Sequence, residues 1–308
     1  MIHISNNTVA IISDLFGTIQ NFDTSNGIAP KDSTIPAYIT ELGIRSLILN
    51  SMSDGLALSD QYLTTPDSQN ISQYKWHRYK NEKVIDDLKT LFTNCDVISF
   101  ADWSDIYGAS DLWDGLLLDI IKPLFKKQFE FVFYLGDPTK RLVQEVDEIL
   151  DIISGFSLYG QVTLVLDPDE ASKLWMVLNG YDPGMSLSTL RLPSPGEKYR
   201  SIFNTMNINH LLICGVDRTL SFSKQGQFEL VNRSHNNARI AKDGRDIFNA
   251  GYCLGLQLQL VISQCVALGL AACGSFMEDG INPDQNALLS YTKRWMAELG
   301  SSTKNSVA

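Results

Sequence analysis

The sequence predicts a three-layer α/β/α fold with a mostly parallel central sheet, and three observations support it. Short apolar runs rich in Val, Ile, Leu and Phe alternate along the chain with stretches of helical pattern. These runs lack the polar alternation of a half-exposed strand, so they are typical of strands that are buried on both faces. The chain has 308 residues, of which 44% are hydrophobic, and this is enough for one large core. We therefore treat residues 1–308 as a single domain and expect the tail, residues 300–308, to be frayed and flexible.

The predicted elements follow from the position of each pattern along the chain. Buried strands are expected at 8–13, 45–50, 96–100, 130–135, 161–166 and 210–214. Helices are expected between them at 34–43, 81–92, 110–127, 140–156 and 169–180. A turn-rich connection over 179–200 precedes the last strand, and a hairpin of residues 220–223 and 228–231 follows it. Two closing helices are expected near 243–258 and 262–273, where small residues allow close packing: Gly251, Gly255, Gly269, Ala271 and Ala272.

Composition argues against several classes of protein. The formal net charge is −10, which disfavours a general nucleic-acid surface. No apolar run reaches about 18 residues, so no membrane span is expected, and the first residues lack the basic segment of a signal peptide. Five scattered cysteines without a C-x-x-C pair predict buried free thiols in a reducing cytosol. We therefore expect a cytoplasmic protein with no nucleic-acid or membrane partner.

One local segment departs from the acidic background. In "SQYKWHRYK", residues 72–80, three aromatic residues interleave with basic ones. Aromatic and basic side chains together can stack on nucleic-acid bases. The interpretation we favour is a short exposed strand or loop.

Polar residues follow the predicted strands, and in an open parallel sheet ligands bind at the carboxyl ends of the strands. The residues at these positions are Asp14, Ser51–Gly55, Asp102, Trp103, Asp137, Asp167, Glu170 and Gly215. Several acids at one edge suggest a polar ligand, a metal, or both. The alternative is that each acid simply caps the helix that follows its strand, because a carboxylate stabilises a helix N-terminus. "LDPDEASKL" illustrates this alternative, since Asp167 followed by Pro168 is an ordinary helix start.

Several motifs occur in the order of one known family. "DGRDIFNAGYCLGL" falls on a signature G-A-G-D-x-F followed by a helix of small residues, with Asp246 at the Asp and Phe248 at the aromatic position. Before it come "LLICGVDRTLSFSKQGQFELV", "VTLVLDPDEASKL", "FYLGDPTKR" and "CDVISFADW". The chain thus resembles the ribokinase-like, PfkB-type carbohydrate kinases from about residue 95 to 275. "DSTIPAYITELGIRSLILNSMSDG" is a weaker match nearer the N-terminus.

The resemblance implies ATP-dependent phosphorylation of a sugar or related polyol, with ATP and Mg²⁺ as cofactors. Asp246 would be the catalytic base, and the helix start at residues 243–246 would form an anion hole for the transferred phosphoryl group. The remaining roles that the resemblance implies are cofactor binding by Asp243, Gly244, Arg245, Gly215 and Asn249, metal binding by Asp167 and Glu170, and substrate binding by Asp14, Asp32 and Asp102. We expect Asp102, Asp137, Asp167 and Asp246 to face one cleft. For Asn249 we favour tight packing of the helix against the sheet.

The chain also departs from the family pattern at several places. Asp243, Gly244 and Arg245 replace G-A-G, and Asp167 replaces the Asn of N-x-x-E. "PKDS", residues 30–33, stands where the family has two sugar-side glycines, and the segment 56–80 leaves room for only a reduced or absent β-strand lid. A second hypothesis is therefore a catalytically degenerate member that binds a ligand or a protein partner. Asp243 and Asp246 also fit an ordinary helix start, as an N-cap and an N3 acid, and a homodimer stays open.

Overall fold

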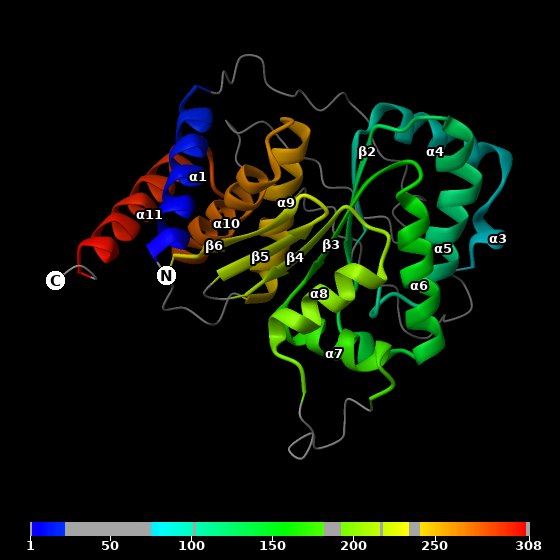
Figure 1. The fold of residues 1–308 in the computed structure, drawn as a ribbon. Coiled ribbons are helices and arrows are strands. Elements are labelled where there is room, and N and C mark those ends of the chain that lie inside the picture. The colour runs from blue at the N-terminus through cyan, green and yellow to red at the C-terminus, as the bar shows by residue number, and fades with distance from the viewer. Residues whose placement is uncertain are drawn as a thin grey trace.

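The computed structural model describes residues 2–21, 75–100, 103–181, 192–215, 218–233 and 241–305. In these residues a six-stranded sheet carries helices on both faces, which confirms the expected three-layer α/β/α architecture (Figure 1). The spatial order of the strands is their order in the chain: β1 (Val97–Phe100), β2 (Phe129–Tyr134), β3 (Gly160–Leu166), β4 (His210–Cys214), β5 (Arg218–Ser223) and β6 (Gly226–Val231). The first four strands are parallel, and β5 and β6 form the predicted antiparallel hairpin at one edge.

Two groups of helices cover the two faces of the sheet (Figure 1). The first face is covered by α4 (Glu82–Asn94), α5 (Ala109–Gly115), α6 (Val143–Phe156), α7 (Pro168–Leu178) and α8 (Pro195–Thr205). A π-helical stretch, η2 (Leu116–Ile121), and a 3-10 turn, η3 (Lys122–Leu124), continue α5. The second face is covered by α9 (Ala241–Gln257) and α10 (Ile262–Asp279), together with α1 (Ile2–Gln20) and α11 (Gln285–Asn305).

The strands supply side chains to both cores in alternation. In β2, Phe129, Phe131 and Phe133 pack into the core under α4–α8, whereas Val132 and Tyr134 pack into the core under α9 and α10. Successive side chains of a strand point to opposite faces, so a strand covered on both sides is apolar at almost every position. This explains why β2 is apolar in the sequence at every position except Glu130.

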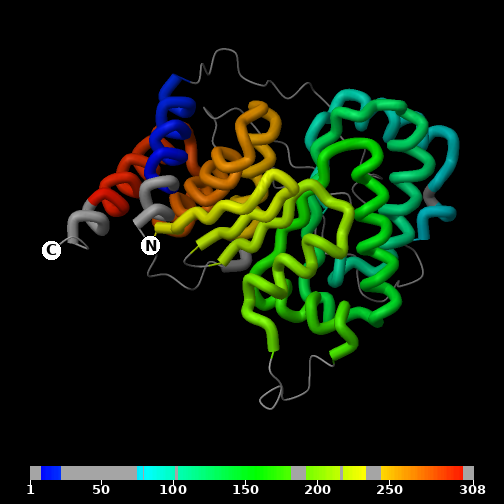
Figure 2. Tube along the Cα trace, viewed as in Figure 1, coloured from blue at the N-terminus to red at the C-terminus, as the bar shows by residue number. Residues whose placement is uncertain are grey.

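The first predicted strand is wrong. Residues 8–13 belong to α1, whose buried side chains Ile12, Leu15 and Ile19 recur at helical spacing. A short apolar run does not by itself distinguish a strand from a buried helix. Figure 2 shows that α1 lies beside α11, so segments near the two ends of the chain pack together.

Two further helices lie where the sequence predicted none. Helix α8 begins inside the expected turn-rich connection, and its start is a capping box in which the Ser194 N–H donates to Glu197 at 2.7 Å. Helix α11 covers residues 285–299, which had no predicted element, and continues through residues 300–305, which corrects the expectation that the tail is frayed from residue 300. The start of α8 carries Ser and Pro residues that are also typical of turns, which is why the connection over 179–200 was predicted as turn-rich.

The segment "SQYKWHRYK" also differs from its favoured interpretation. Trp76 begins a one-turn helix, α3 (Trp76–Tyr79), and its side chain is only 5% exposed. The indole N–H donates to Asp119 of η2 at 2.6 Å. The aromatic residue at the centre of this segment is therefore a core residue rather than part of an exposed strand or loop.

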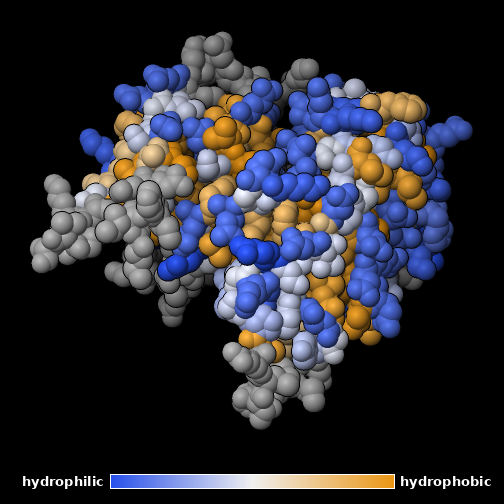
Figure 3. All heavy atoms as spheres, in the orientation of Figure 1, coloured by the Kyte–Doolittle hydropathy of each residue, from blue (hydrophilic) through white to orange (hydrophobic). Residues whose placement is uncertain are grey.

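The described surface of the protein shows no unusual separation of polar and apolar side chains on the face that is viewed in Figure 3. Hydrophilic and hydrophobic side chains are interspersed on the face viewed in Figure 3, as is usual for protein surfaces. Among the described helices, none has the length and apolar character needed to cross a bilayer. All five cysteines are free, and burial raises the pKa of the Cys253 thiol.

The predicted helix 34–43, the strand 45–50 and most of the 56–80 lid segment lie outside the described residues.

Close packing of α9 on α10 confirms the expectation from the small residues. A Cβ added at Gly251 would lie 2.9 Å from the Cβ of Ala272 and 2.9 Å from the Cα of Gly269. A Cβ added at Gly255 would lie 2.8 Å from the Cα of Cys265. These distances are shorter than ordinary van der Waals contacts, so the two helices meet at their backbones.

We predict that Gly251→Ala destabilises the protein although alanine favours helices. The added methyl group meets backbone and Ala272, and overpacking of this kind costs about 1–3 kcal/mol. The control is Gly17→Ala in α1, where a Cβ would have nothing within 4 Å and the gain should be up to about 1 kcal/mol. Urea unfolding of the two variants measures both effects, and equal midpoints would contradict the prediction.

Candidate functional site

The carboxyl end of β3 leads directly into α7 through a reciprocal cap. Asp167 is the N-cap residue, and its carboxylate accepts a hydrogen bond from the Glu170 N–H at 2.7 Å. The Glu170 carboxylate in turn accepts one from the Asp167 N–H at 3.0 Å. Pro168 occupies the first helical position, where a missing N–H costs nothing. The capping interpretation of Asp167 is thus confirmed.

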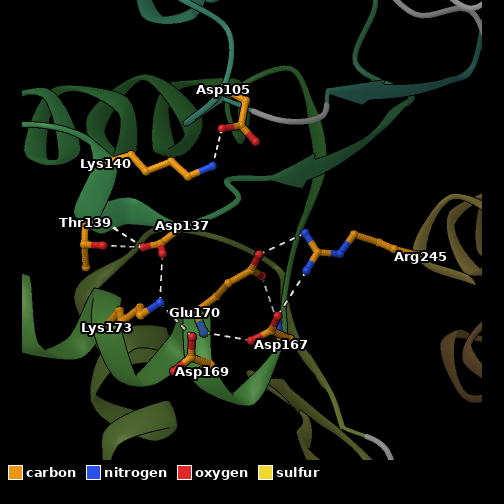
Figure 4. Close-up of polar contacts among 9 residues, drawn as sticks. All are labelled: Asp105, Asp137, Thr139, Lys140, Asp167, Asp169, Glu170, Lys173 and Arg245. Atoms are coloured by element: carbon orange, nitrogen blue, oxygen red, sulfur yellow. Dashed lines mark hydrogen bonds and ion pairs between the residues drawn. The ribbon is translucent and has the colours of Figure 1, made fainter. Parts of the chain in front are cut away.

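Arg245 of α9 reaches across to this cap (Figure 4). One terminal nitrogen of its guanidinium lies 3.1 Å from an Asp167 oxygen, and the other lies 2.9 Å from a Glu170 oxygen. The Glu170 side chain is 8% exposed, whereas those of Arg245 and Asp167 are about one-third exposed. Burial raises the pKa of Glu170, and Arg245 opposes that rise. Burial also works against the charged guanidinium, but Glu170 and Asp167 together raise the pKa of Arg245.

A second polar cluster follows β2 at the same edge of the sheet (Figure 4). Asp137 accepts a hydrogen bond from the Thr139 N–H at 2.9 Å and from Lys173 of α7 at 2.8 Å. Lys173 also pairs with Asp169 at 2.8 Å. Burial alone would raise the pKa of Asp137, but the hydrogen bonds from Lys173 and Thr139 outweigh it and lower that pKa to about 2. Asp137 and Asp167 therefore lie at one edge, as expected, each held by a cation.

Basic residues in this second cluster were missed in the sequence. Lys140 pairs with Asp105, and Arg141 donates to the backbone carbonyls of Ser104 and Ile106 at 3.1 and 2.7 Å. These contacts tie the segment after β1 to the segment after β2. The pairing of Lys173 with Asp169 could have been predicted from the sequence, because the two residues are four apart and lie on one helix face. Arg141 has the same spacing to Glu145, with which it pairs at 3.9 Å, but its contacts with distant backbone carbonyls had no signal in the sequence.

Of the residues that the resemblance implies for cofactor binding, one lies at the edge of the sheet and two others are used in packing. Gly215 lies beside the start of α7, because a Cβ added there would be 3.4 Å from Pro168, so it joins Asp167 and Arg245 at the edge. Gly244 instead faces α10, where an added Cβ would be 3.1 Å from the Cys273 sulfur. Asn249 is buried and donates to the Ser99 hydroxyl of β1 at 2.8 Å. Its amide is thus engaged in packing the helix on the sheet, as we favoured.

The structure describes the candidate base and one of the three acids that were expected to bind the substrate. Asp246 is half-buried, directly follows Arg245 in α9, and makes an interaction of its own. Asp14 is exposed on helix α1 and follows no strand, so the placement expected for it at the ligand edge is wrong. Asp32 and Asp102 lie outside the described residues, as does the side chain of Asp243.

Helix α9 begins earlier than the sequence suggested. It starts at Ala241, so Asp243 lies inside the first turn and is not the N-cap, which corrects the predicted cap. In an α-helix each N–H bonds to the carbonyl four residues before it, so only the first N–H groups are left without a partner. With this start, the N–H groups of 241–243 have no partner within the helix, and those of 244–246 are expected to be used within it.

The acids at β3 do not fit the magnesium role that the resemblance implied. Both carboxylates already pair with Arg245. In the part of the chain that the structure describes, no three His, Cys, Asp or Glu side chains gather in a way that could hold a metal ion. Mg²⁺ commonly requires several oxygen ligands at about 2.0–2.1 Å. The chemistry of this donor set therefore favours an internal ion pair.

The fold and the motif order define the class of this chain as a ribokinase-like, PfkB-type carbohydrate kinase. A family model described as prokaryotic ketohexokinase matches residues 32–295, which is most of the chain. The chain therefore belongs to the prokaryotic ketohexokinase family. The comparison with curated proteins gives no match.

The chain is similar to several solved structures, of which the first two described here support the fold. Adenosine kinase from Trypanosoma brucei brucei is 10% identical, with 67% of this chain and 57% of that chain covered and a TM-score of 0.50. Adenosine kinase from Sinorhizobium meliloti is 11% identical, with 67% and 56% covered and a TM-score of 0.50. Ribokinase from Thermotoga maritima is 12% identical, with 69% and 61% covered and a TM-score of 0.48. This chain thus spans less than two thirds of the length of these proteins, and the likeness is one of fold.

We predict that Lys173→Met raises the pKa of Asp137 from about 2 toward its ordinary 3.8. The lowered pKa means that Asp137 stabilises the fold above its ordinary pKa and that this contribution is lost as the pH falls through about 2. For a partly exposed pair the stabilisation is about 0.5–1 kcal/mol. A carboxyl NMR titration measures the shift. Lys140→Met is the control and should leave the Asp137 titration unchanged.

Proposed function

We propose that this protein transfers the γ-phosphoryl group of ATP to a hydroxyl group of a ketohexose or a related polyol. The observation that carries the proposal is the family match over residues 32–295. Within this range the sequence resembles the family signature in which Asp246 corresponds to the base. The parallel sheet with its polar carboxyl edge supports it, because such edges bind ligands in open α/β folds. The sugar and the phosphoryl donor are parts of the proposal.

In the proposed reaction Asp246 accepts the proton of the attacking hydroxyl group. The hydroxyl oxygen forms a bond to the γ-phosphorus while the bond from that phosphorus to the β,γ-bridging oxygen breaks, which gives a sugar phosphate and ADP. The unpaired N–H groups at the start of α9 provide donors for phosphate oxygens, and the helix dipole favours negative charge there. Gly215 lets the backbone after β4 pack closely against Pro168 at the start of α7.

A second candidate is a family member that binds a ligand or a partner without catalysis. Two observations favour it: Arg245 occupies Asp167 and Glu170, and Gly244 is used in packing against α10. Both differ from a glycine-lined anion hole beside a metal. The two candidates share the same fold and edge, so turnover separates them.

We predict that Asp246→Asn lowers sugar-dependent ADP release by a factor of about 10²–10⁴, the usual contribution of general base catalysis. The amide keeps the size of the side chain but cannot take the proton. A coupled ADP assay with ATP and a panel of ketohexoses and polyols measures the rate. Asp279→Asn, an exposed acid near the end of α10, is the matched control and should leave the rate unchanged.

Equal rates for wild type and Asp246→Asn would contradict the role of Asp246 as base. A wild type that phosphorylates none of the sugars would favour the second candidate.

We also predict that Asp243→Asn strengthens nucleotide binding. Asp243 lies in the first turn of α9, beside the N–H groups proposed to receive phosphate, and an added negative charge there opposes a polyphosphate. Removing the charge should lower the Kd for ADP several-fold, and calorimetry measures it. The effect should weaken in high salt, because exposed charges are screened. An unchanged affinity would mean that Asp243 does not face the phosphates.

A further inference from the structure

The Arg245, Asp167 and Glu170 side chains form a closed ion-pair triad at the carboxyl end of β3 (Figure 4). Arg245 comes from α9, and the two acids come from the start of α7, on the opposite face of the sheet. Glu170 is almost fully buried. The triad therefore joins the two helical layers across the edge of the sheet.

Every carboxylate oxygen of the triad has a donor. In Asp167, Oδ1 accepts from the Glu170 N–H at 2.7 Å, and Oδ2 accepts from Arg245 at 3.1 Å. In Glu170, Oε2 accepts from the Asp167 N–H at 3.0 Å, and Oε1 pairs with Arg245 at 2.9 Å. A buried charge is tolerated when it is paired and hydrogen-bonded, and this arrangement meets both conditions.

The guanidinium occupies the place between the two carboxylates that an ion would need. One oxygen of each acid faces the same guanidinium, at 3.1 Å for Asp167 and 2.9 Å for Glu170. A divalent ion at the same oxygens would have to displace Arg245, which would then leave a charge unpaired in a half-buried position. Arg245 stands where the family signature has a small residue, so a positive side chain at this position is a feature of this chain and not of the signature.

We propose that Arg245 is the resident cation of this edge and that it replaces a divalent metal ion at Asp167 and Glu170. The resting protein then holds no divalent ion at these carboxylates, and the guanidinium is the cation that pairs with both of them. Asp167 and Glu170 are structural acids that fix Arg245 beside Asp246. Loss of Arg245 exposes two adjacent carboxylates and creates a weak divalent-cation site where none existed.

The first experiment is a Mn²⁺ titration followed by electron paramagnetic resonance, without nucleotide. Wild type and Glu170→Gln should bind Mn²⁺ equally, because Glu170 holds no metal. Gln at this position keeps the reciprocal cap. A specific Mn²⁺ site in the wild type that disappears in Glu170→Gln would overturn the proposal, and this comparison does not depend on any Arg245 variant folding.

The second experiment uses thermal unfolding with and without Mn²⁺. Arg245→Gln should unfold at a lower temperature than wild type, and Mn²⁺ at millimolar concentration should recover part of the loss. Arg245→Gln/Glu170→Gln should show no such recovery, and Arg245→Lys, which keeps the charge, should resemble wild type in its indifference to Mn²⁺. Recovery that is the same in the double variant, or equal Mn²⁺ effects on wild type and Arg245→Gln, would overturn the proposal. Neither experiment contains nucleotide or sugar, so the result is separate from the phosphoryl-transfer assay.

Discussion

The contact between α9 and α10 is the constraint on which the candidate site depends. Gly251, Gly255 and Gly269 let the two helices meet at their backbones, and this fixes the height and rotation of α9 on the sheet. The Asn249 hydrogen bond to Ser99 adds a second anchor, to β1. Helix α9 carries both Arg245 and Asp246, so a helix held a few ångströms further out would separate Arg245 from its two acids. Backbone packing at one end of α9 thus sets the electrostatics at the other.

Electrostatics at the edge are arranged as local pairs. Asp137 is paired with Lys173, and Asp167 and Glu170 are paired with Arg245. A protein with net charge −10 places its cations at this edge in direct contact with acids. The local field there is consequently weaker than the number of acids suggests, which reduces the repulsion that an anionic ligand would meet.

Much of the fold could be predicted from the sequence, and the physical reason is burial. Strands β1–β4 are covered on both faces, so they read as continuous apolar runs, and the small residues of α9 and α10 indicated their close contact. Helix α1 was mistaken for a strand because six apolar and small residues cannot separate the two periods. Helices α8 and α11 were missed because polar, turn-like residues surround their starts.

The sequence predicted several of the residues that lie at the site, but it did not predict which of them pair with one another. The rule that residues directly after parallel strands lie at one edge correctly predicted the place of Asp137, Asp167 and Glu170. The same prediction was wrong for Asp14, because the strand expected before it is a helix. The pairing of Arg245 with Asp167 spans 78 residues, and only the three-dimensional packing of α9 brings it about. Sequence spacing also placed the start of α9 two residues too late, because the residues before Asp243 carry no clear helix signal.

The reciprocal cap at the start of α7 has a consequence for how its two acids are interpreted. Asp167 and Glu170 satisfy two backbone N–H groups and begin a helix, whether or not any reaction occurs beside them. Selection for folding alone is enough to preserve such a pair. An acidic motif of this kind is therefore evidence for a helix start, and by itself it is not evidence for catalysis or metal binding.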